Sequence, residues 1–222
     1  MANTKEGFIP FISLNFSEEE THQRAEDFYE LMNKRRSLRM FSDKPVPKAV
    51  IENLIRTAST APSGAHQQPW TFCAISSAAI KSQIREAAEK EEYDNYHGRM
   101  SDRWLKDLKP FGTDHIKPFL EIAPWIIVVM KRSYELVNDE KKNNYYATES
   151  VGLATGLLLA AIHNAGLVAL THTPSPMNFL TKVLDRPANE KPFLLIPVGY
   201  AADDAQVPAL QRKTLAEMTV FY

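Results

Sequence analysis

Three arginines and a serine lie close together after the first predicted helix, at Arg35, Arg36, Ser37 and Arg39. A guanidinium group keeps its positive charge and offers a planar fork of donors, which suits the oxygens of a phosphate. The same residues could instead form a solvated basic helix end, where cations complement the helix dipole. The pattern therefore indicates either a phosphate-binding segment or an exposed helix terminus, and the residue types alone leave both open.

Two further segments are candidates for ligand contact. Residues 60–70, TAPSGAHQQPW, form a loop of small residues that leads into an apolar strand, and small residues let backbone N–H groups approach a ligand closely. Residues 170–174, LTHTP, follow another apolar segment, and ligands often bind beyond the ends of buried strands. The alternatives are a plain helix-to-strand connection and an ordinary strand exit.

The sequence lacks the motifs of several other kinds of site. No two of the 6 histidines have the spacing of a helical metal pair, and the 1 cysteine, Cys73, cannot form an internal disulfide or a multi-thiolate zinc site. Neither G-x-x-x-x-G-K-[ST] nor G-x-G-x-x-G occurs, and no serine or cysteine lies in a recognised nucleophile motif. We expect no metal, and the missing motifs argue against a P-loop or Rossmann nucleotide site, though not against a cofactor held by side chains.

Hydrophobic spacing and capping residues predict the elements that position these segments. The predicted helices are 18–34, 45–61, 78–100, 144–164 and 178–184. The predicted strands are 70–75, 125–130, 168–170 and 193–198. Few buried strands among more numerous helices indicate an α+β fold, a three-layer sandwich with a small mixed central sheet flanked by helices.

Composition indicates one folded domain over residues 1–222. The 222 residues are 44% hydrophobic and 24% charged, which is ordinary for a globular protein. The formal net charge of -1 gives no general attraction to nucleic acid or to an anionic membrane. The first residues lack the pattern of a secretory signal, and residues 151–170 are too interrupted for a membrane span. The expected compartment is the cytoplasm.

Two features favour a homodimer. The ends of the chain, residues 1–16 and 201–222, carry apolar side chains that need a covering surface. The helix predicted at 144–164 places Gly152 and Gly156 on one stripe, where small residues permit close helix contact. Such a stripe fits a core contact or a dimer seam, and the apolar ends favour the seam.

These segments, in this order, resemble the nitroreductase superfamily and, within it, the iodotyrosine deiodinases. The resemblance covers about residues 30–215, through RRSLRMFSDKPVP, RTASTAPSGAHQQPWTF, NAGLVALTHTP, RPANEKP, PVGY and VPALQRKTL. Its specific parts are TAPSGAH-x-x-PWTF and RPA-x-EK. The resemblance implies a nitroreductase-like, domain-swapped homodimer in which both terminal arms embrace the partner and two FMN sites lie at the interface.

The resemblance also implies which residues bind FMN. Those expected at the phosphate and ribityl chain are Arg35, Arg36, Ser37, Arg39 and Arg212. Ser63 of the partner subunit is expected to close the pocket, and Thr171 and His172 to add backbone contacts. Thr173, the expected catalytic residue, would donate to flavin N5, which favours one-electron-reduced flavin and distinguishes deiodinases from hydride-transferring relatives.

The substrate residues implied by the resemblance form a clamp for an amino-acid zwitterion on a lid. Glu92 would pair with the ammonium group and Lys117 with the carboxylate, to which Tyr96 would donate its hydroxyl. The backbone N–H of Ala65 would hold the phenolate oxygen. Glu92 is preferred over the adjacent Glu91 because it keeps a three-residue gap to Tyr96. The alternative is a charged helix face and a surface lysine.

The expected activity is FMN-dependent reductive dehalogenation of halotyrosines such as 3-iodotyrosine, giving tyrosine and halide. The electron donor would be NAD(P)H or a reductase. Two other functions stay open: a general NAD(P)H-dependent nitroreductase or quinone reductase, and a halotyrosine-binding flavoprotein without turnover. The sequence shows no N-terminal anchor like that of the animal enzymes, so a soluble microbial form is expected.

Overall fold

The computed structural model describes residues 6–222 as two units, divided between Arg35 and Arg36. In the first unit, the predicted arm is irregular from residue 8 to residue 17, and residues 1–5 of that arm lie outside the described residues. Helix α1 (Glu18–Asn33) begins at a capping box. The Glu20 N–H donates to the Ser17 hydroxyl at 3.2 Å, and the Glu20 carboxylate accepts from the Ser17 N–H at 2.9 Å. No residue of α1 is buried.

The second unit is built on a four-stranded sheet. Its strands, in spatial order, are β1 (Trp70–Ile75), β2 (Trp125–Arg132), β6 (Glu190–Gly199) and β5 (Val168–Ala169). Every strand pair is antiparallel. The parallel pairing within the described residues is a single bridge between Ser37 and Ala169. The small central sheet is therefore confirmed, but its four strands pair antiparallel and not in the mixed arrangement that was expected.

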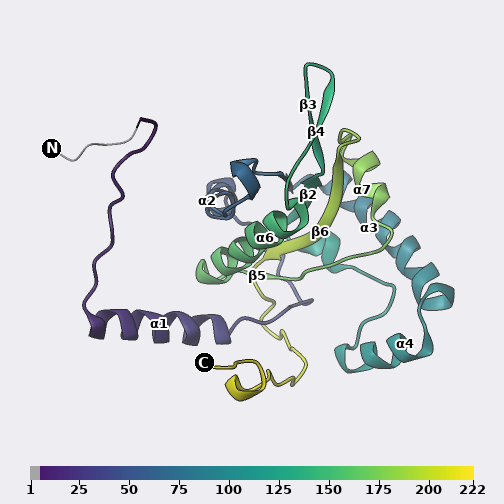
Figure 1. The fold of residues 1–222 in the computed structure, drawn as a ribbon. Coiled ribbons are helices and arrows are strands. Elements are labelled where there is room, and N and C mark those ends of the chain that lie inside the picture. The colour runs from purple at the N-terminus through teal and green to yellow at the C-terminus, as the bar shows by residue number, and fades with distance from the viewer. Residues whose placement is uncertain (1–5) are drawn as a thin grey trace. The chain divides into compact units, whose positions relative to one another are not determined.

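Helices cover both faces of the sheet, which gives the expected three layers (Figure 1). One face carries α2 (Lys48–Ser59) and α6 (Ala147–Asn164). The other face carries α3 (Ala78–Asp94), α5 (Phe119–Ile122) and α7 (Asn178–Val183). The chain thus forms one hydrophobic cluster on each side of the sheet, as the α+β prediction requires.

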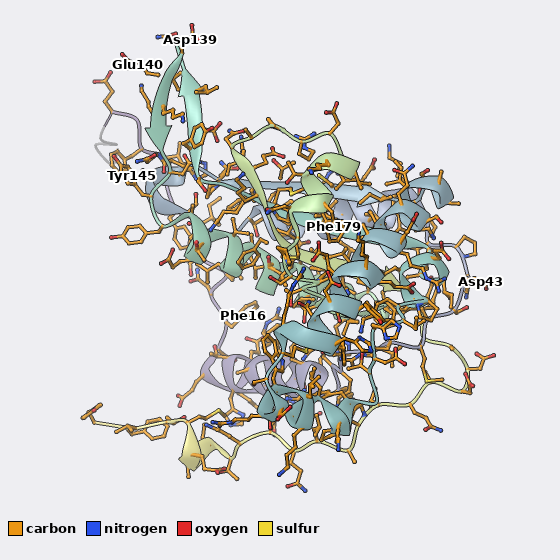
Figure 2. All side chains as sticks on the ribbon, turned by 90° about the vertical axis from the view of Figure 1, so that its right-hand side faces the viewer. Phe16, Asp43, Asp139, Glu140, Tyr145 and Phe179 are labelled. Carbon is orange, nitrogen blue, oxygen red and sulfur yellow. The ribbon has the colours of Figure 1, made fainter. Side chains whose placement is uncertain are left out.

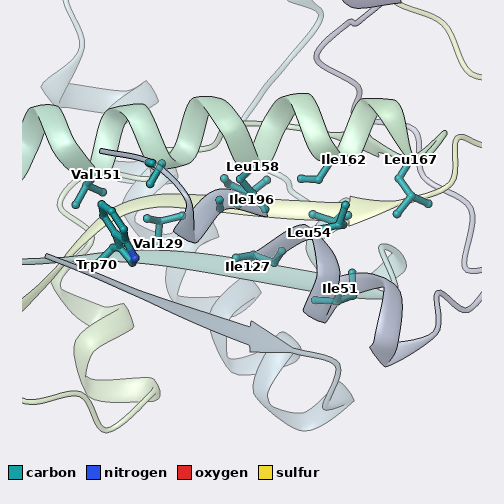
Figure 3. Packing of buried hydrophobic residues seen from close by; sticks show 14 of the residues in the cluster. Ile51, Leu54, Trp70, Ile127, Val129, Val151, Leu158, Ile162, Leu167 and Ile196 are labelled. Atoms are coloured by element: carbon teal, nitrogen blue, oxygen red, sulfur yellow. The ribbon is translucent and has the colours of Figure 1, made fainter. Parts of the chain in front are cut away.

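Strand β2 joins the two clusters. Ile127 and Val129 pack toward α2 and α6, whereas Ile126 and Val128 pack toward α3, α5 and α7. All four side chains are fully buried, because successive side chains of a strand point to opposite faces and both faces are covered. This explains the continuous apolar run in the sequence. Figure 3 shows Ile127 and Val129 below α6, opposite Leu158.

The structure differs from the sequence prediction between β2 and α6. The helix predicted from residue 144 begins at Ala147, and the residues before it form a hairpin of β3 (Tyr134–Val137) and β4 (Glu140–Asn143). Its turn residues, Asn138 and Asp139, have positive φ angles of 53° and 64°, as a type I′ hairpin turn requires. Figure 2 shows the tip of this hairpin at Asp139 and Glu140, with Tyr145 at its base.

The segment between α3 and α5 carries short helices. It comprises η2 (Asn95–Arg99), α4 (Asp102–Leu108) and η3 (Lys109–Phe111). The helix predicted over 78–100 is thus α3 continued by the π-helical turn η2. Two other short helices are η1 (Gly64–His66), in the loop before β1, and η4 (Leu215–Glu217), near the C-terminus. Among residues 6–222, none of the helices combines the length and apolar character needed to cross a membrane.

Candidate active site

The arginine-rich segment lies along the edge of the sheet next to β5. Ser37 forms a parallel bridge with Ala169, and the Leu38 N–H donates to the Ala169 carbonyl at 3.2 Å. Leu38 is buried, whereas Arg36 and Ser37 are exposed and Arg39 is half-buried. The buried leucine anchors the segment at the edge of the sheet.

The predicted segment 170–174 continues from β5 along β6, directly beside these residues. The His172 N–H donates to the Leu195 carbonyl at 2.9 Å, and the Leu195 N–H donates to the His172 carbonyl at 3.1 Å. Thr171 and Thr173 are exposed. The structure therefore brings together two segments that the sequence separates widely, and their hydroxyls lie at one edge of the sheet.

The three predicted clamp residues also meet. Glu92 lies in the last turn of α3, and its carboxylate is 3.2 Å from the Lys117 ammonium, with side-chain exposures of 8% and 3%. The same ammonium donates to the Thr113 hydroxyl at 3.1 Å and lies 5.4 Å from the Tyr96 ring centre. The Tyr96 hydroxyl donates to the Thr113 carbonyl at 3.2 Å.

The neighbouring Glu91 faces elsewhere. Its carboxylate forms an ion pair of 2.6 Å with Arg99, whose side chain is 46% exposed. Of the two glutamates that the sequence leaves as candidates, Glu92 is the one that faces Lys117. The roles of both remain predictions.

Burial perturbs the ionisable groups of the clamp. Burial lowers the pKa of Lys117, and the nearby Glu92 carboxylate opposes that shift. Burial also raises the pKa of Tyr96, which keeps its hydroxyl a proton donor. The pKa of Arg39 is lowered by burial as well. A dry site strengthens each charge interaction with a ligand.

His172 lies next to this clamp with one unpaired ring atom. Its ring meets the Phe119 ring edge-on, with 5.7 Å between centres, and its Nε2 is buried without a hydrogen-bond partner in the described part of the chain. Burial, then the positive charges of Lys117 and Arg39, lower the His172 pKa to about 3. The imidazole is neutral at pH 7, and the surrounding cations favour an anionic ligand.

This donor set fits FMN. Arg36 and Arg39 supply planar cationic forks for a phosphate, and Ser37 adds an exposed hydroxyl. The Thr173 side chain is exposed at the same edge of the sheet. Arg35 belongs to the first unit, and Arg212 lies exposed on the segment after β6. Their predicted phosphate contacts remain untested.

The loop that carries Ser63 and Ala65 has a constrained backbone. Ala65 has a φ of 48°, in the left-handed region that costs energy for residues other than glycine. The Ser63 hydroxyl accepts from the Gln68 N–H at 2.9 Å, and the Gln67 side-chain carbonyl accepts from the Tyr145 N–H at 2.7 Å. The first bond closes the loop on itself, and the second holds it against the start of α6.

The loop and the clamp lie apart within one chain. The Gly64 N–H, between Ser63 and Ala65, donates to the Ser150 hydroxyl of α6 at 3.4 Å, whereas Glu92 belongs to α3, which packs on the other face of the sheet. The structure therefore does not bring Ser63 and Ala65 to the Glu92–Lys117 pair of the same chain. The role expected of Ser63 of the partner subunit stays a prediction.

Sequence reasoning missed several residues around the clamp. Thr113 and Asp114 accept hydrogen bonds from the Lys117 ammonium, and Glu89 accepts one from the Lys117 backbone. Glu89 lies one helical turn before Glu92, a spacing that could have placed both on one face of α3. The Thr113 and Asp114 contacts come from loop geometry, for which the sequence carries no periodic signal.

Comparison with known proteins gives the family. The model of the nitroreductase family matches residues 32–200. An iodotyrosine deiodinase from Haliscomenobacter hydrossis is 58% identical over 219 residues, which are 98% of this chain and 99% of that protein. An iodotyrosine deiodinase from Danio rerio is 48% identical over 216 residues, covering 96% of this chain and 72% of that protein.

A solved structure agrees with these relatives. The crystal structure of oxidized iodotyrosine deiodinase bound to FMN and 3-iodo-L-tyrosine superimposes with a TM-score of 0.77 at 28% sequence identity. The match covers 87% of this chain and 100% of that one. Together with the geometry described above, these likenesses show that the chain belongs to the nitroreductase family, in its iodotyrosine deiodinase branch.

Proposed function

We propose that the protein is an FMN-dependent iodotyrosine deiodinase, which converts halotyrosines such as 3-iodotyrosine to tyrosine and halide. The observation that carries this proposal is the buried Glu92–Lys117 ion pair with Tyr96 beside it. A nitroaromatic or quinone has no amino-acid group for such a pair to recognise. The named relatives at 48% and 58% identity support the same conclusion.

The clamp suits a zwitterion because it holds a carboxylate and an ammonium group side by side in a buried site. When an amino acid binds, the Glu92 carboxylate pairs with the ligand ammonium instead of with Lys117. The Lys117 ammonium then pairs with the ligand carboxylate instead of with Glu92. Each buried charge keeps a partner, so the desolvation penalty of an unpaired ion is avoided. Tyr96 remains protonated and can turn its hydroxyl from Thr113 to the carboxylate.

Several of the cofactor residues in this proposal lie on the two segments that meet at the edge of the sheet, residues 36–39 and 171–173. Arg36, Ser37 and Arg39 would hold the phosphate and ribityl chain, with Arg35 and Arg212 completing the set. Thr173 would donate its hydroxyl to N5 of the ring, while Thr171 and His172 would contribute backbone contacts. When bound, FMN supplies the two electrons that, with one proton, replace the halogen of the substrate by hydrogen and release halide.

The lid, residues 95–117, has a gating role in this proposal. It carries Tyr96 to a ligand held by Glu92 and by Lys117, at the fixed C-terminal end of the lid. Binding the zwitterion therefore closes the lid over the aromatic ring and excludes water from it. The Ala65 N–H would hold the phenolate oxygen, which fixes the ring at its other end.

We further propose that the active unit is a homodimer with shared sites. On α6, Leu153 is 54% exposed and Leu157 is 37% exposed. The helix is indented at Gly152 and Gly156, beside a surface hollow of about 640 Å³. A large exposed apolar face with small residues suits close helix contact with a second copy. A partner's loop would then bring Ser63 of the partner subunit to the pocket that one chain leaves incomplete.

The test is a titration of the FMN-loaded, oxidised protein with 3-iodotyrosine, followed by flavin fluorescence, with tyrosine as control. Tight quenching by 3-iodotyrosine and weak quenching by tyrosine are expected, followed by iodide release when dithionite reduces the protein. Dithionite replaces the natural electron donor, whether NAD(P)H or a reductase. Binding without iodide release would instead indicate a halotyrosine-binding flavoprotein. No binding, with nitroaromatic reduction intact, would indicate a general nitroreductase.

A further inference from the structure

Glu89 contacts Lys117 at its backbone. One carboxylate oxygen of Glu89 accepts the Lys117 N–H at 2.6 Å and the Arg85 Nε–H at 2.8 Å. Glu89 lies one turn before Glu92 on α3, and Glu92 pairs with the Lys117 ammonium at 3.2 Å. One face of α3 therefore holds both the backbone and the side-chain end of Lys117.

The Lys117 backbone needs this acceptor. Lys117 is 2% exposed, and a buried N–H without a partner is costly. The following residue, Pro118, restricts Lys117 to extended backbone conformations, and the Lys117 carbonyl already accepts from the Leu120 N–H at 3.1 Å. With both peptide groups of the residue fixed, its side chain leaves the backbone in one direction, toward Glu92.

Arg85 fixes the orientation of Glu89 in turn. Its guanidinium donates to Glu89 and, at 2.7 Å, to Glu121 on α5. These hydrogen bonds, first that to Glu89 and then that to Glu121, raise the Arg85 pKa. A planar fork shared by two carboxylates limits their rotation. Glu89 consequently presents its oxygen to Lys117 from a fixed place between α3 and α5.

We propose that Glu89, oriented by Arg85, is a positioning residue for carboxylate recognition: it holds the Lys117 backbone so that the Lys117 ammonium meets the carboxylate of a halotyrosine. This inference rests on the proposed function and names the part of the ligand that Glu89 controls. It acts through Lys117 and touches neither substrate nor cofactor.

Two ligands separate this role from a purely structural one. 3-Iodotyrosine carries both charges of the zwitterion, whereas 3-iodotyramine lacks the carboxylate. In the FMN-loaded protein, Glu89→Ala should weaken 3-iodotyrosine binding about tenfold or more, as losing a hydrogen bond to a charged group does. Binding of 3-iodotyramine should change little. Glu89→Gln keeps an oxygen acceptor and should recover most of the affinity, and Glu86→Ala, one turn earlier on the exposed side of α3, is the matched control.

A double-mutant cycle with Lys117→Met completes the test. Because Glu89 acts through Lys117, Glu89→Ala should add no further loss of 3-iodotyrosine affinity in the Lys117→Met protein. Equal losses for both ligands, or additive losses in the cycle, would overturn the inference. If Glu89→Ala does not fold, Arg85→Gln replaces it and should give a smaller loss that is again confined to 3-iodotyrosine.

The same data separate this inference from the proposed function. If the unaltered protein binds 3-iodotyrosine no better than 3-iodotyramine, no carboxylate is recognised, and both the clamp and the role of Glu89 are refuted. If the unaltered protein distinguishes the two ligands and the Glu89 and Arg85 variants distinguish them equally well, only the role of Glu89 is refuted.

Discussion

Replacing Lys117 by methionine removes one charge of the clamp while keeping an unbranched apolar stem. A ligand carboxylate that replaces Glu92 at the same 3.2 Å from the Lys117 ammonium is attracted by about 5 kcal/mol at an effective dielectric constant of about 20. Desolvation of both ions offsets part of this, so the net loss on removing one partner is about 2–3 kcal/mol. The dissociation constant of 3-iodotyrosine should rise roughly 30- to 150-fold.

Ligands with single charges show which group each residue binds. Flavin fluorescence titrations would compare 3-iodotyrosine with 3-iodotyramine and with the corresponding arylpropionate, which keeps only the carboxylate. Lys117→Met should weaken the two ligands that carry a carboxylate, and Glu92→Gln the two that carry an ammonium group. FMN content serves as the control for folding. A uniform loss across all three ligands would refute the assignment of one charge to each residue.

Three further predictions concern other parts of the molecule. The His172 pKa of about 3 lies below its ordinary 6.5, so the unfolded chain binds the extra proton between these values. The free energy of unfolding should then fall with decreasing pH by up to about 1.4 kcal/mol per pH unit. In His172→Gln, urea unfolding at several pH values should show a weaker dependence of this free energy on pH. An unchanged pH dependence would exclude His172 as its source. In Gly64→Ala, the new Cβ would lie 2.7 Å from the Tyr145 carbonyl oxygen. The backbone shift that this contact forces should lower stability by roughly 1–3 kcal/mol in thermal unfolding. An unchanged Tm would contradict the close approach. Leu157→Glu on the exposed face of α6 should give a monomer without FMN in gel filtration, while Leu136→Glu on the hairpin should still elute as the dimer; identical elution of the two variants would argue against α6 as the seam.

The sequence predicted best those elements that have a periodic apolar face or a clear cap. Strand β1 has the predicted bounds, and α3 begins at Ala78 after its Ser77 cap. The hairpin was missed because residues 134–143 are mostly polar and make little contact with the core, so no alternation marks them as strands. The start of α6 was misplaced because Tyr146, with a φ of 48°, is an uncommon N-cap that capping rules do not predict.

The residues of the candidate site could be predicted from the sequence, but the distances between them could not. Family resemblance named Glu92, Tyr96 and Lys117, and the choice of Glu92 followed from spacing on a helix. Their burial could not be predicted, because it depends on how a loop far along the chain packs onto α3. The unpaired Nε2 of His172 had no sequence signal either, since it arises where the edge segment meets Phe119.

Helix α1 has 16 residues and none of them is buried, and a helix of about this length is only marginally stable without packing. It leads directly into Arg35 and Arg36, the first residues expected at the phosphate. In a homodimer, as proposed, association would supply the missing packing of α1. Dilution would then weaken the packing of α1 and the cofactor contacts together. The apparent FMN affinity would then depend on protein concentration by mass action, and activity measured at very low enzyme concentration would understate that of the assembled protein.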